Sequence, residues 1–405
     1  MDRPLADGNA EAHDDTPTAE QVAAVKGHVF LLRSRGWRAD ADDISERFGL
    51  PSEQSEVATG PDRVLGVFHD TVITTQHFRA VDEREARQAV RDGLRFVDIE
   101  IFSQCNRRCH YCSNTKLDRL SSNEFMSDEV FDQIVGDLGS IEWDGQIRFI
   151  GLNEPTMHRE SLVSRARAAR ERVPNAHLVV FTNGDYLTRD YLEELYAAGV
   201  RQLQISVHLQ RFMPFDGHKV LKRIRMLAHR LDVGWRLDRY VPEREIYGTL
   251  LFRDMAIQIF QLDYEHQGHD RGGILDGIGP RDYVRTAACF VPIQMMVVGY
   301  NGNVLPCCHF VGDAEQHKGL VVGTLGKGRS LFEIYASPEY VGWRKSLASV
   351  GPKGAECQKC SDYADHAMMQ SADVADAVNH PAAATAVQVF GGESSEQSVE
   401  GIFRT

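Results

Sequence analysis

The 405-residue sequence contains no stretch of about 18 consecutive apolar residues, which is the length that a membrane-spanning helix needs. Its first residues are polar and acidic, and they lack the apolar core of a signal peptide. An excess of basic residues is also missing, since 45 Lys and Arg face 58 Asp and Glu. We therefore expect a cytoplasmic protein that has no membrane partner and does not bind nucleic acid.

Cysteine is absent from the long stretch between residues 112 and 289, although the chain has eight cysteines. They occur in two groups, at Cys105, Cys109 and Cys112 and at Cys289, Cys307, Cys308, Cys357 and Cys360. Disulfides are rare in a reducing compartment. Grouping of this kind in a cytosolic chain favours metal ligation.

The two ends of the chain differ in composition from its middle. Residues 1–20 are rich in Asp, Ala, Gly and Thr, which predicts a disordered tail. Residues 21–95 are expected to form an N-terminal extension, mainly helical, with either a hairpin or an irregular cover at 62–80. Residues 381–405 mix Ala, Gly, Ser and Glu and are expected to form a loose tail.

Strand and helix patterns alternate between residues 96 and 270. The expected strands are 96–102, 146–151, 177–184, 201–209, 233–241 and 255–263. Amphipathic helices follow the first four, and Ser127 is a candidate N-cap for the first helix. Such alternation builds right-handed βαβ units and a parallel sheet. The predicted fold is α/β, a partial (β/α)6 TIM-like barrel, because six units are too few for a closed eight-unit barrel.

The pattern changes after residue 270, and residues 271–380 are expected to form a small α+β domain. MMVVGYNGNVLPCC predicts a β-hairpin around Asn301 and Gly302. Residues 330–350 have a helical pattern, which is interrupted near Pro338.

The stretch CNRRCHYC, residues 105–112, follows the first expected strand and so lies at the strand's C-terminal end. In parallel barrels, this is the end where chemistry takes place. Three thiolates can occupy three corners of a cubane iron–sulfur cluster and leave the fourth iron without a protein ligand. A zinc site that used His110 as the fourth ligand is sterically awkward, because this histidine lies inside the run of ligands.

The spacing of these cysteines, with Tyr111 before the last one, resembles the CxxxCxΦC signature of radical S-adenosylmethionine (SAM) enzymes. GLNEPT (151–156), TNG (182–184) and ISVHL (205–209) stand at strand ends where that family carries comparable elements. The resemblance implies a 4Fe–4S cluster on Cys105, Cys109 and Cys112 whose open iron binds SAM. An electron from the cluster would cleave SAM, and the resulting 5′-deoxyadenosyl radical would abstract hydrogen from a substrate.

The same resemblance implies three residues that contact SAM. Glu154 is expected to accept a hydrogen bond from the ammonium group of the cofactor. Asn183 and Ser206 are candidates for contacts with its sugar or carboxylate, and capping of a turn and a strand end is the alternative for both. The residues themselves indicate no catalytic acid or base, although HQGHDRGG (266–273) has side chains that could face a substrate.

The second cysteine group resembles the auxiliary-cluster domains called SPASM, in the shorter twitch form, because no cysteine follows Cys360. This resemblance implies a second 4Fe–4S cluster on Cys289, Cys307, Cys357 and Cys360. Spacing alone fits structural zinc equally well. Cys308 is left over as a buried neighbour, an alternative ligand to Cys307 or a hydrogen-atom donor.

A barrel with one fully ligated auxiliary cluster suits a net oxidation, because such a cluster carries electrons and does not bind the substrate. The resemblance therefore implies a small-molecule dehydrogenase, or a related modification of carbohydrates or aminocyclitols, in natural-product biosynthesis. A peptide-modifying maturase is the alternative enzyme, and an iron–sulfur or zinc regulatory protein is the alternative from another class. The expected partners are a small-molecule or peptide substrate and an electron donor of the flavodoxin or ferredoxin type.

Overall fold

The computed structural model describes residues 72–119, 123–280, 282–362 and Val387–Gln388. The predicted N-terminal tail, the helices expected before residue 72 and nearly all of the predicted C-terminal tail lie outside the described residues. Within the described residues, no helix is long and apolar enough to span a bilayer.

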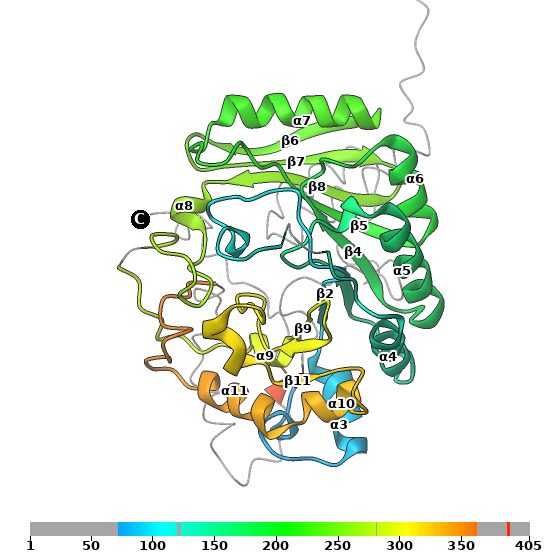
Figure 1. Ribbon diagram of the computed structural model, residues 1–405, viewed down its shortest axis with the longest axis vertical. Coiled ribbons are helices and arrows are strands. Elements are labelled where there is room, and N and C mark those ends of the chain that lie inside the picture. Colours follow the sequence, from blue (N-terminus) through cyan, green and yellow to red (C-terminus); the bar gives the residue numbers. More distant parts are fainter. Residues whose placement is uncertain (1–71, 120–122, 281, 363–386, 389–405) are drawn as a thin grey trace, which may run out of the picture.

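Ten strands form one mixed sheet in the order β11-β10-β9-β2-β3-β4-β5-β8-β7-β6, and β1 and β12 form a separate antiparallel pair. Figure 1 shows this sheet running through the whole molecule. The strands are β1 (Val72–Ile73), β2 (Phe96–Ile99), β3 (Gln146–Phe149), β4 (His177–Thr182), β5 (Val200–Ser206), β6 (Gly234–Val241), β7 (Glu245–Phe252), β8 (Met255–Leu262), β9 (Met295–Val298), β10 (Asn303–Leu305), β11 (Gly323–Thr324) and β12 (Val387–Gln388).

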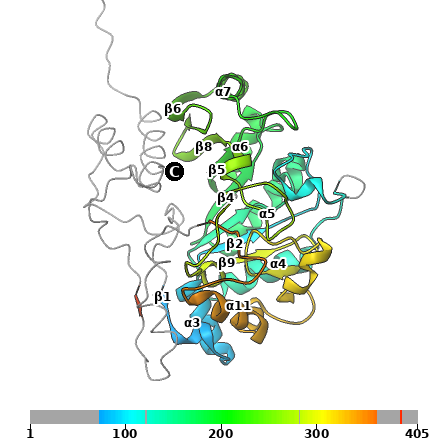
Figure 2. The same cartoon turned by 90° about the vertical axis from the view of Figure 1, so that its left-hand side faces the viewer.

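Helices connect and cover these strands. The α-helices are α3 (Glu83–Gly93), α4 (Asp128–Gly139), α5 (Arg159–Arg172), α6 (Arg189–Ala197), α7 (Gly217–Leu231), α8 (Tyr264–Gln267), α9 (Val291–Gln294), α10 (Leu331–Tyr335) and α11 (Pro338–Ala348). The 3-10 helices are η1 (Thr75–Phe78), η2 (Ser113–Thr115), η3 (Pro155–Met157) and η4 (Glu315–Leu320). Both views place α7 at one end of the molecule and α3 and α11 at the other (Figures 1 and 2).

The predicted partial TIM-like barrel is confirmed. Six neighbouring strands, β9-β2-β3-β4-β5-β8, run parallel. Helices α4, α5, α6 and α7 follow β2, β3, β4 and β5, as the sequence predicted. Ser127 is the N-cap of α4, and its side chain accepts from the backbone N–H of Val130. Figure 1 shows α4, α5 and α6 along the outer side of the parallel strands.

Side chains alternate between two environments along the barrel strands, as a two-residue period requires. On β2, Val97 and Ile99 are fully buried in the apolar core, whereas Asp98 lines an interior pocket. On β3, Phe149 belongs to the core and Arg148 faces the pocket. The barrel therefore has an apolar outer face beneath its helices, and its inner face carries charged side chains among apolar ones such as Phe96.

The prediction that 233–241 forms a parallel barrel unit is wrong. β6 pairs antiparallel with β7, a strand that the sequence analysis missed, and β7 pairs antiparallel with β8. Only residues 242–244 separate β6 from β7. Antiparallel strands can be joined by such a tight turn, whereas parallel strands need a long crossover. β8 then runs parallel to β5 and serves as a barrel strand.

The sixth parallel strand comes from the C-terminal part of the chain. The predicted hairpin forms between β9 and β10, and Gly302 adopts φ 79° at its turn. β9 also pairs in parallel with β2, from Phe96 opposite Met295 to Ile99 opposite Val298. The helical stretch is divided as predicted, and Pro338 occupies the first turn of α11.

Candidate active site

The first cysteine group lies in the loop after β2, which we call the cluster loop (residues 105–112). Its backbone turns on itself, because the N–H of Cys112 donates to the carbonyl of Cys109 (2.9 Å). Arg107 fixes the loop to the next strands through a 2.7 Å ion pair with Asp185 and a 3.2 Å hydrogen bond to the carbonyl of His208. The loop therefore holds its three thiols at the C-terminal end of the parallel strands.

The surroundings of these thiols suit a positively charged centre. Burial raises the pKa of Cys105 to about 12 and that of Cys109 to about 11, and neighbouring thiols add to both shifts. A bound cation reverses such a penalty, since a coordinating thiol is deprotonated outright. Cys105 and Cys109 thus favour their thiolate state only when metal is present.

The spacing of the sulfurs favours a cluster over a single ion. Within the described residues, two groups of three potential ligands have all ligand atoms within 4.8 Å of one another, namely Cys307 with Cys308 and His309, and His269 with His309 and Asp362. Neither group contains a thiol of the cluster loop. Tetrahedral zinc, with Zn–S bonds of about 2.3 Å, holds its thiolates about 3.8 Å apart. The three loop sulfurs therefore do not all lie as close together as a single zinc ion would hold them.

Glu154 follows β3, and its side chain is buried at 2% exposure. One carboxylate oxygen, Oε1, accepts from the N–H and hydroxyl of Thr156 and from the hydroxyl of Thr182, and the other, Oε2, accepts from the N–H of Asn183 at 2.6 Å. An ionised carboxylate has about four lone-pair sites, so Oε2 keeps one site for a further donor. The expected bond to a cofactor ammonium stays a prediction.

Asn183 and Ser206 end the next two strands of the sheet. The amide group of Asn183 donates to the side chain of Asn106 in the cluster loop (2.8 Å) and accepts from the N–H of Asp185 (3.0 Å). Ser206 is the last residue of β5 and lies beside Tyr264. Tyr264 in turn stacks on Tyr111 of the cluster loop, with ring centroids 4.7 Å apart. The structure therefore places all three predicted cofactor residues near the cluster loop, and their contacts with SAM stay predictions.

The four predicted auxiliary ligands, Cys289, Cys307, Cys357 and Cys360, come together from three separate segments; we call them the auxiliary set. Cys289 and Cys360 are electrostatic neighbours of Cys307, and Cys357 is a neighbour of Cys289. Burial raises the pKa of Cys357 to about 12 and also raises the pKa of Cys289 and Cys360. As in the cluster loop, this environment disfavours thiolates without metal.

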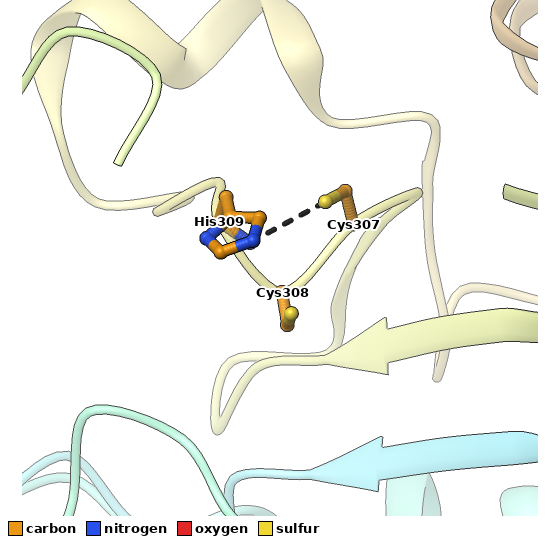
Figure 3. Close-up of side chains that lie close together, drawn as sticks. All are labelled: Cys307, Cys308 and His309. Carbon is orange, nitrogen blue, oxygen red and sulfur yellow. Dashed lines mark hydrogen bonds between the residues drawn. The ribbon is translucent and has the colours of Figure 1, made fainter. Parts of the chain in front are cut away.

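Cys308 does not belong to this set. Apart from Cys307, the groups that influence the pKa of Cys308 are His309, Asp362 and Asp98. Figure 3 shows the Cys307 sulfur on the same side of the chain as His309, whose backbone N–H donates to this sulfur at 3.5 Å. The Cys308 side chain points to the opposite side. Of the two adjacent cysteines, Cys307 thus faces the other auxiliary cysteines and Cys308 faces the barrel interior.

A pocket of about 580 Å³ lies between the two cysteine groups. Cys112 of the cluster loop and Cys308 both line it. Its charged walls include the Asp98–Arg148 ion pair (2.5 Å) and Arg119, which bridges Glu100 (2.5 Å) to Asp313 (2.7 Å). Four carboxylates, three guanidinium groups and two histidines line the pocket, namely Asp98, Glu100, Asp313, Asp362, Arg119, Arg148, Arg271, His269 and His309.

The HQGHDRGG segment, residues 266–273, reaches this pocket through His269 and Arg271. Arg271 donates to the carbonyl of Cys308 (3.2 Å), and His269 packs edge-on against His309, with centroids 4.5 Å apart. His309 lies 2.8 Å from Asp362. Although burial acts in the opposite direction, this bond to His309 holds the pKa of Asp362 at about 2. Together these side chains present both hydrogen-bond donors and acceptors to the pocket.

Sequence reasoning missed several of these residues. Asp98 and Glu100 alternate with apolar residues in FVDIEIF. This two-residue period predicts that the two carboxylates lie on the same face of the strand. Arg285 had no such signal. It is 1% exposed, and its guanidinium donates to the carbonyls of Ala288 (2.8 Å), Cys360 (3.1 Å) and Asp362 (2.7 Å) and lies 3.9 Å from the Cys360 sulfur.

Two family models match the parts of the chain that carry these sites. A model of the radical SAM superfamily matches residues 99–232, and a model of an iron–sulfur cluster-binding domain, SPASM, matches residues 289–361. The chain is a radical SAM enzyme. The radical SAM match contains the cluster loop, and the SPASM match begins at Cys289 and ends just after Cys360.

Individual relatives agree with this assignment. The S-adenosyl-L-methionine-dependent 2-deoxy-scyllo-inosamine dehydrogenase of Niallia circulans is 26% identical over 268 residues, which are 66% of this chain and 92% of the relative. The AdoMet-dependent heme synthase of Methanosarcina barkeri is 24% identical over 217 residues, 51% of this chain and 60% of that protein. The crystal structure of BtrN with AdoMet and 2-DOIA has a TM-score of 0.50 at 22% identity and supports the fold, covering 69% of this chain and 97% of its own.

The family assignment establishes the cofactors of this radical SAM enzyme as SAM and 4Fe–4S clusters. The three thiols of the cluster loop and the four of the auxiliary set supply the ligand types that such clusters use. The alternative of a regulatory metal protein is therefore wrong.

Proposed function

We propose that this radical SAM enzyme oxidises a hydroxyl group of a small, polar molecule of the carbohydrate or aminocyclitol type. The observation that carries the proposal is the pocket of about 580 Å³ between Cys112 and Cys308. Its walls offer carboxylates, which accept hydrogen bonds from hydroxyl and ammonium groups, and guanidinium groups, which donate to hydroxyl oxygens. The similarity to a 2-deoxy-scyllo-inosamine dehydrogenase supports the same substrate class.

The reaction removes two electrons and two hydrogens from the substrate, a hydrogen atom from the carbinol carbon and a proton and an electron from the remaining radical. When bound, the clusters and SAM supply the radical that takes the hydrogen atom and the acceptor for the second electron. Cys105, Cys109 and Cys112 would hold the first cluster, and the auxiliary set would hold the second. The pocket walls would fix the carbinol carbon toward Cys112 and keep the other hydroxyls bonded.

The polar walls are held rigidly for this task. Arg119 is 6% exposed and joins Glu100 of the barrel to Asp313 of the C-terminal part. The N–H of Leu152 also donates to Glu100 at 2.7 Å. Because these charged side chains are already held by fixed partners, they lose little conformational entropy when a polyol replaces water in the pocket.

The test is an anaerobic assay of the reconstituted enzyme with reductant, SAM and a panel of aminocyclitols that carry deuterium on single carbinol carbons. We expect one 5′-deoxyadenosine for each ketone formed, and transfer of deuterium to 5′-deoxyadenosine from one labelled position. Deoxyadenosine formation with a peptide panel and with no polyol would contradict the proposal and favour a peptide-modifying enzyme.

The remaining expectations belong to the same proposal. Its electron donor would be a small one-electron carrier of the flavodoxin or ferredoxin type. Eight free cysteines suit a reducing compartment, so we propose a cytoplasmic location.

A further inference from the structure

The segment from β5 to the end of α7 (residues 207–231) has a charge opposite to that of the whole chain. It contains six Lys or Arg and one Asp, whereas the formal net charge of the chain is −13. Lys219 and Lys222 are exposed on the first turns of α7. Asp216, the one acidic residue of the segment, lies 3.1 Å from Lys219. A local field of this sign attracts acidic proteins even on an acidic molecule.

Phe212 is displayed at the edge of this segment in an unusual way. Its side chain is 68% exposed, and its backbone adopts φ 61°, a left-handed conformation that is unfavourable for a residue other than glycine. The guanidinium of Arg211 lies 4.6 Å from the centre of the Phe212 ring. Exposed aromatic rings beside arginine are typical of the energetic centres of protein interfaces.

This surface is joined directly to the cluster loop. The Phe212 ring stacks on His110 at 5.5 Å, and the Phe212 N–H donates to the same imidazole at 3.3 Å. His110 stands between Cys109 and Cys112. On the α7 side, Arg223 lies 3.8 Å from Asp185, which also binds Arg107 of the cluster loop. A protein seated on Phe212 and α7 would therefore touch residues adjacent to the predicted iron ligands.

We propose that Arg211, Phe212, Lys219 and Lys222 form a docking surface, the donor face, for an acidic one-electron carrier protein that reduces the cluster held by the cluster loop. One electron passes from the carrier to the cluster, and no atoms are transferred. The proposal rests on the proposed function, since a radical SAM enzyme needs this electron before each cleavage of SAM. The opposite charges of the partners would align them, and Phe212 would provide the apolar contact.

The test compares two charge-reversal variants of the anaerobic holoenzyme. Lys219→Glu/Lys222→Glu changes the donor face, and Lys327→Glu/Lys345→Glu makes the same change in net charge at exposed positions near α10 and on α11, at the opposite end of the molecule. Binding of oxidised flavodoxin is measured by calorimetry at low and high salt. We expect the donor-face variant to bind about tenfold more weakly at low salt, with a flatter salt dependence, and the control to bind like the wild type.

Phe212→Ala separates the apolar contact from the charges. We expect weaker flavodoxin binding with an unchanged salt dependence, because the variant keeps every charge. For all variants, SAM cleavage driven by dithionite should equal that of the wild type, since a small reductant does not need the donor face. If dithionite drives no SAM cleavage by the wild type, the proposed function is overturned. The measurement of flavodoxin binding would still test whether the donor face is a docking surface.

Two results would overturn the proposal. One is equal flavodoxin binding by the wild type and the donor-face variant. The other is an equal loss of binding in the Lys327→Glu/Lys345→Glu control, which would show a general charge effect.

Discussion

The cluster loop and the auxiliary set are assembled in different ways. The cluster loop takes its three thiols from eight consecutive residues, and local turns hold them. The auxiliary set draws four thiols from positions spread between residues 289 and 360, and Arg285 ties the ends of that span together. A site made from one loop can lose its metal without disturbing the fold, whereas a site made from distant segments is itself part of the fold.

Breaking the cluster loop should have the largest effect on activity. We expect Cys112→Ala to lower SAM cleavage about a thousandfold or more, equivalent to about 4 kcal/mol of transition-state stabilisation. Iron should fall by about half, because the auxiliary set keeps its cluster. Deoxyadenosine assays and iron and sulfide analysis check both. A variant that kept full iron would show that Cys112 is not a ligand.

Breaking the auxiliary set should have a different result. We expect Cys360→Ala to keep dithionite-driven SAM cleavage but to lose substrate oxidation, because the second electron has no acceptor. Thermal unfolding should begin at least about 5 °C lower, since three chain segments lose their common link. Calorimetry beside the Cys112→Ala protein tests this contrast, and an equal loss of stability in both variants would refute it.

Arg285 offers a smaller change in the same region. Arg285→Met leaves several buried carbonyls without a donor, and we expect a loss of about 3 kcal/mol in the free energy of unfolding. It also removes a cation 3.9 Å from the Cys360 sulfur, so the auxiliary cluster should become harder to reduce. Denaturant titration and a redox titration followed by electron paramagnetic resonance measure these effects. Arg236→Met, at an exposed position on β6, is the matched control.

Cys308 should give the smallest effect on metal content. It faces the barrel interior, so Cys308→Ala should retain the iron and sulfide of both clusters. Elemental analysis decides the point. Loss of auxiliary iron in this variant, together with full iron in Cys307→Ala, would exchange the roles assigned to these two neighbours.

Much of this arrangement could be predicted from local sequence. Cysteine spacing identified both groups, and the alternation of patterns identified the first four barrel strands and their helices. The pairing of β9 with β2 left no local signal, because the two strands are about 200 residues apart and each reads only as a short apolar run. The hairpin of β6 and β7 was missed, because β7 was not recognised as a strand and periodicity does not give the direction of β6. Arg285 could not be found, since its role depends on carbonyls that only the folded chain brings together.

The parallel pairing of β9 with β2 has a practical consequence. β2 leads into the cluster loop. The edge of β2 that faces away from β3 pairs with β9, the strand that precedes Cys307 in the chain. A fragment that stopped before Cys289 would leave this edge open to another chain, as exposed edge strands generally are. The catalytic half of the enzyme is thus unsuited to expression alone, and exchange of SPASM domains between relatives would need to bring a matching β9.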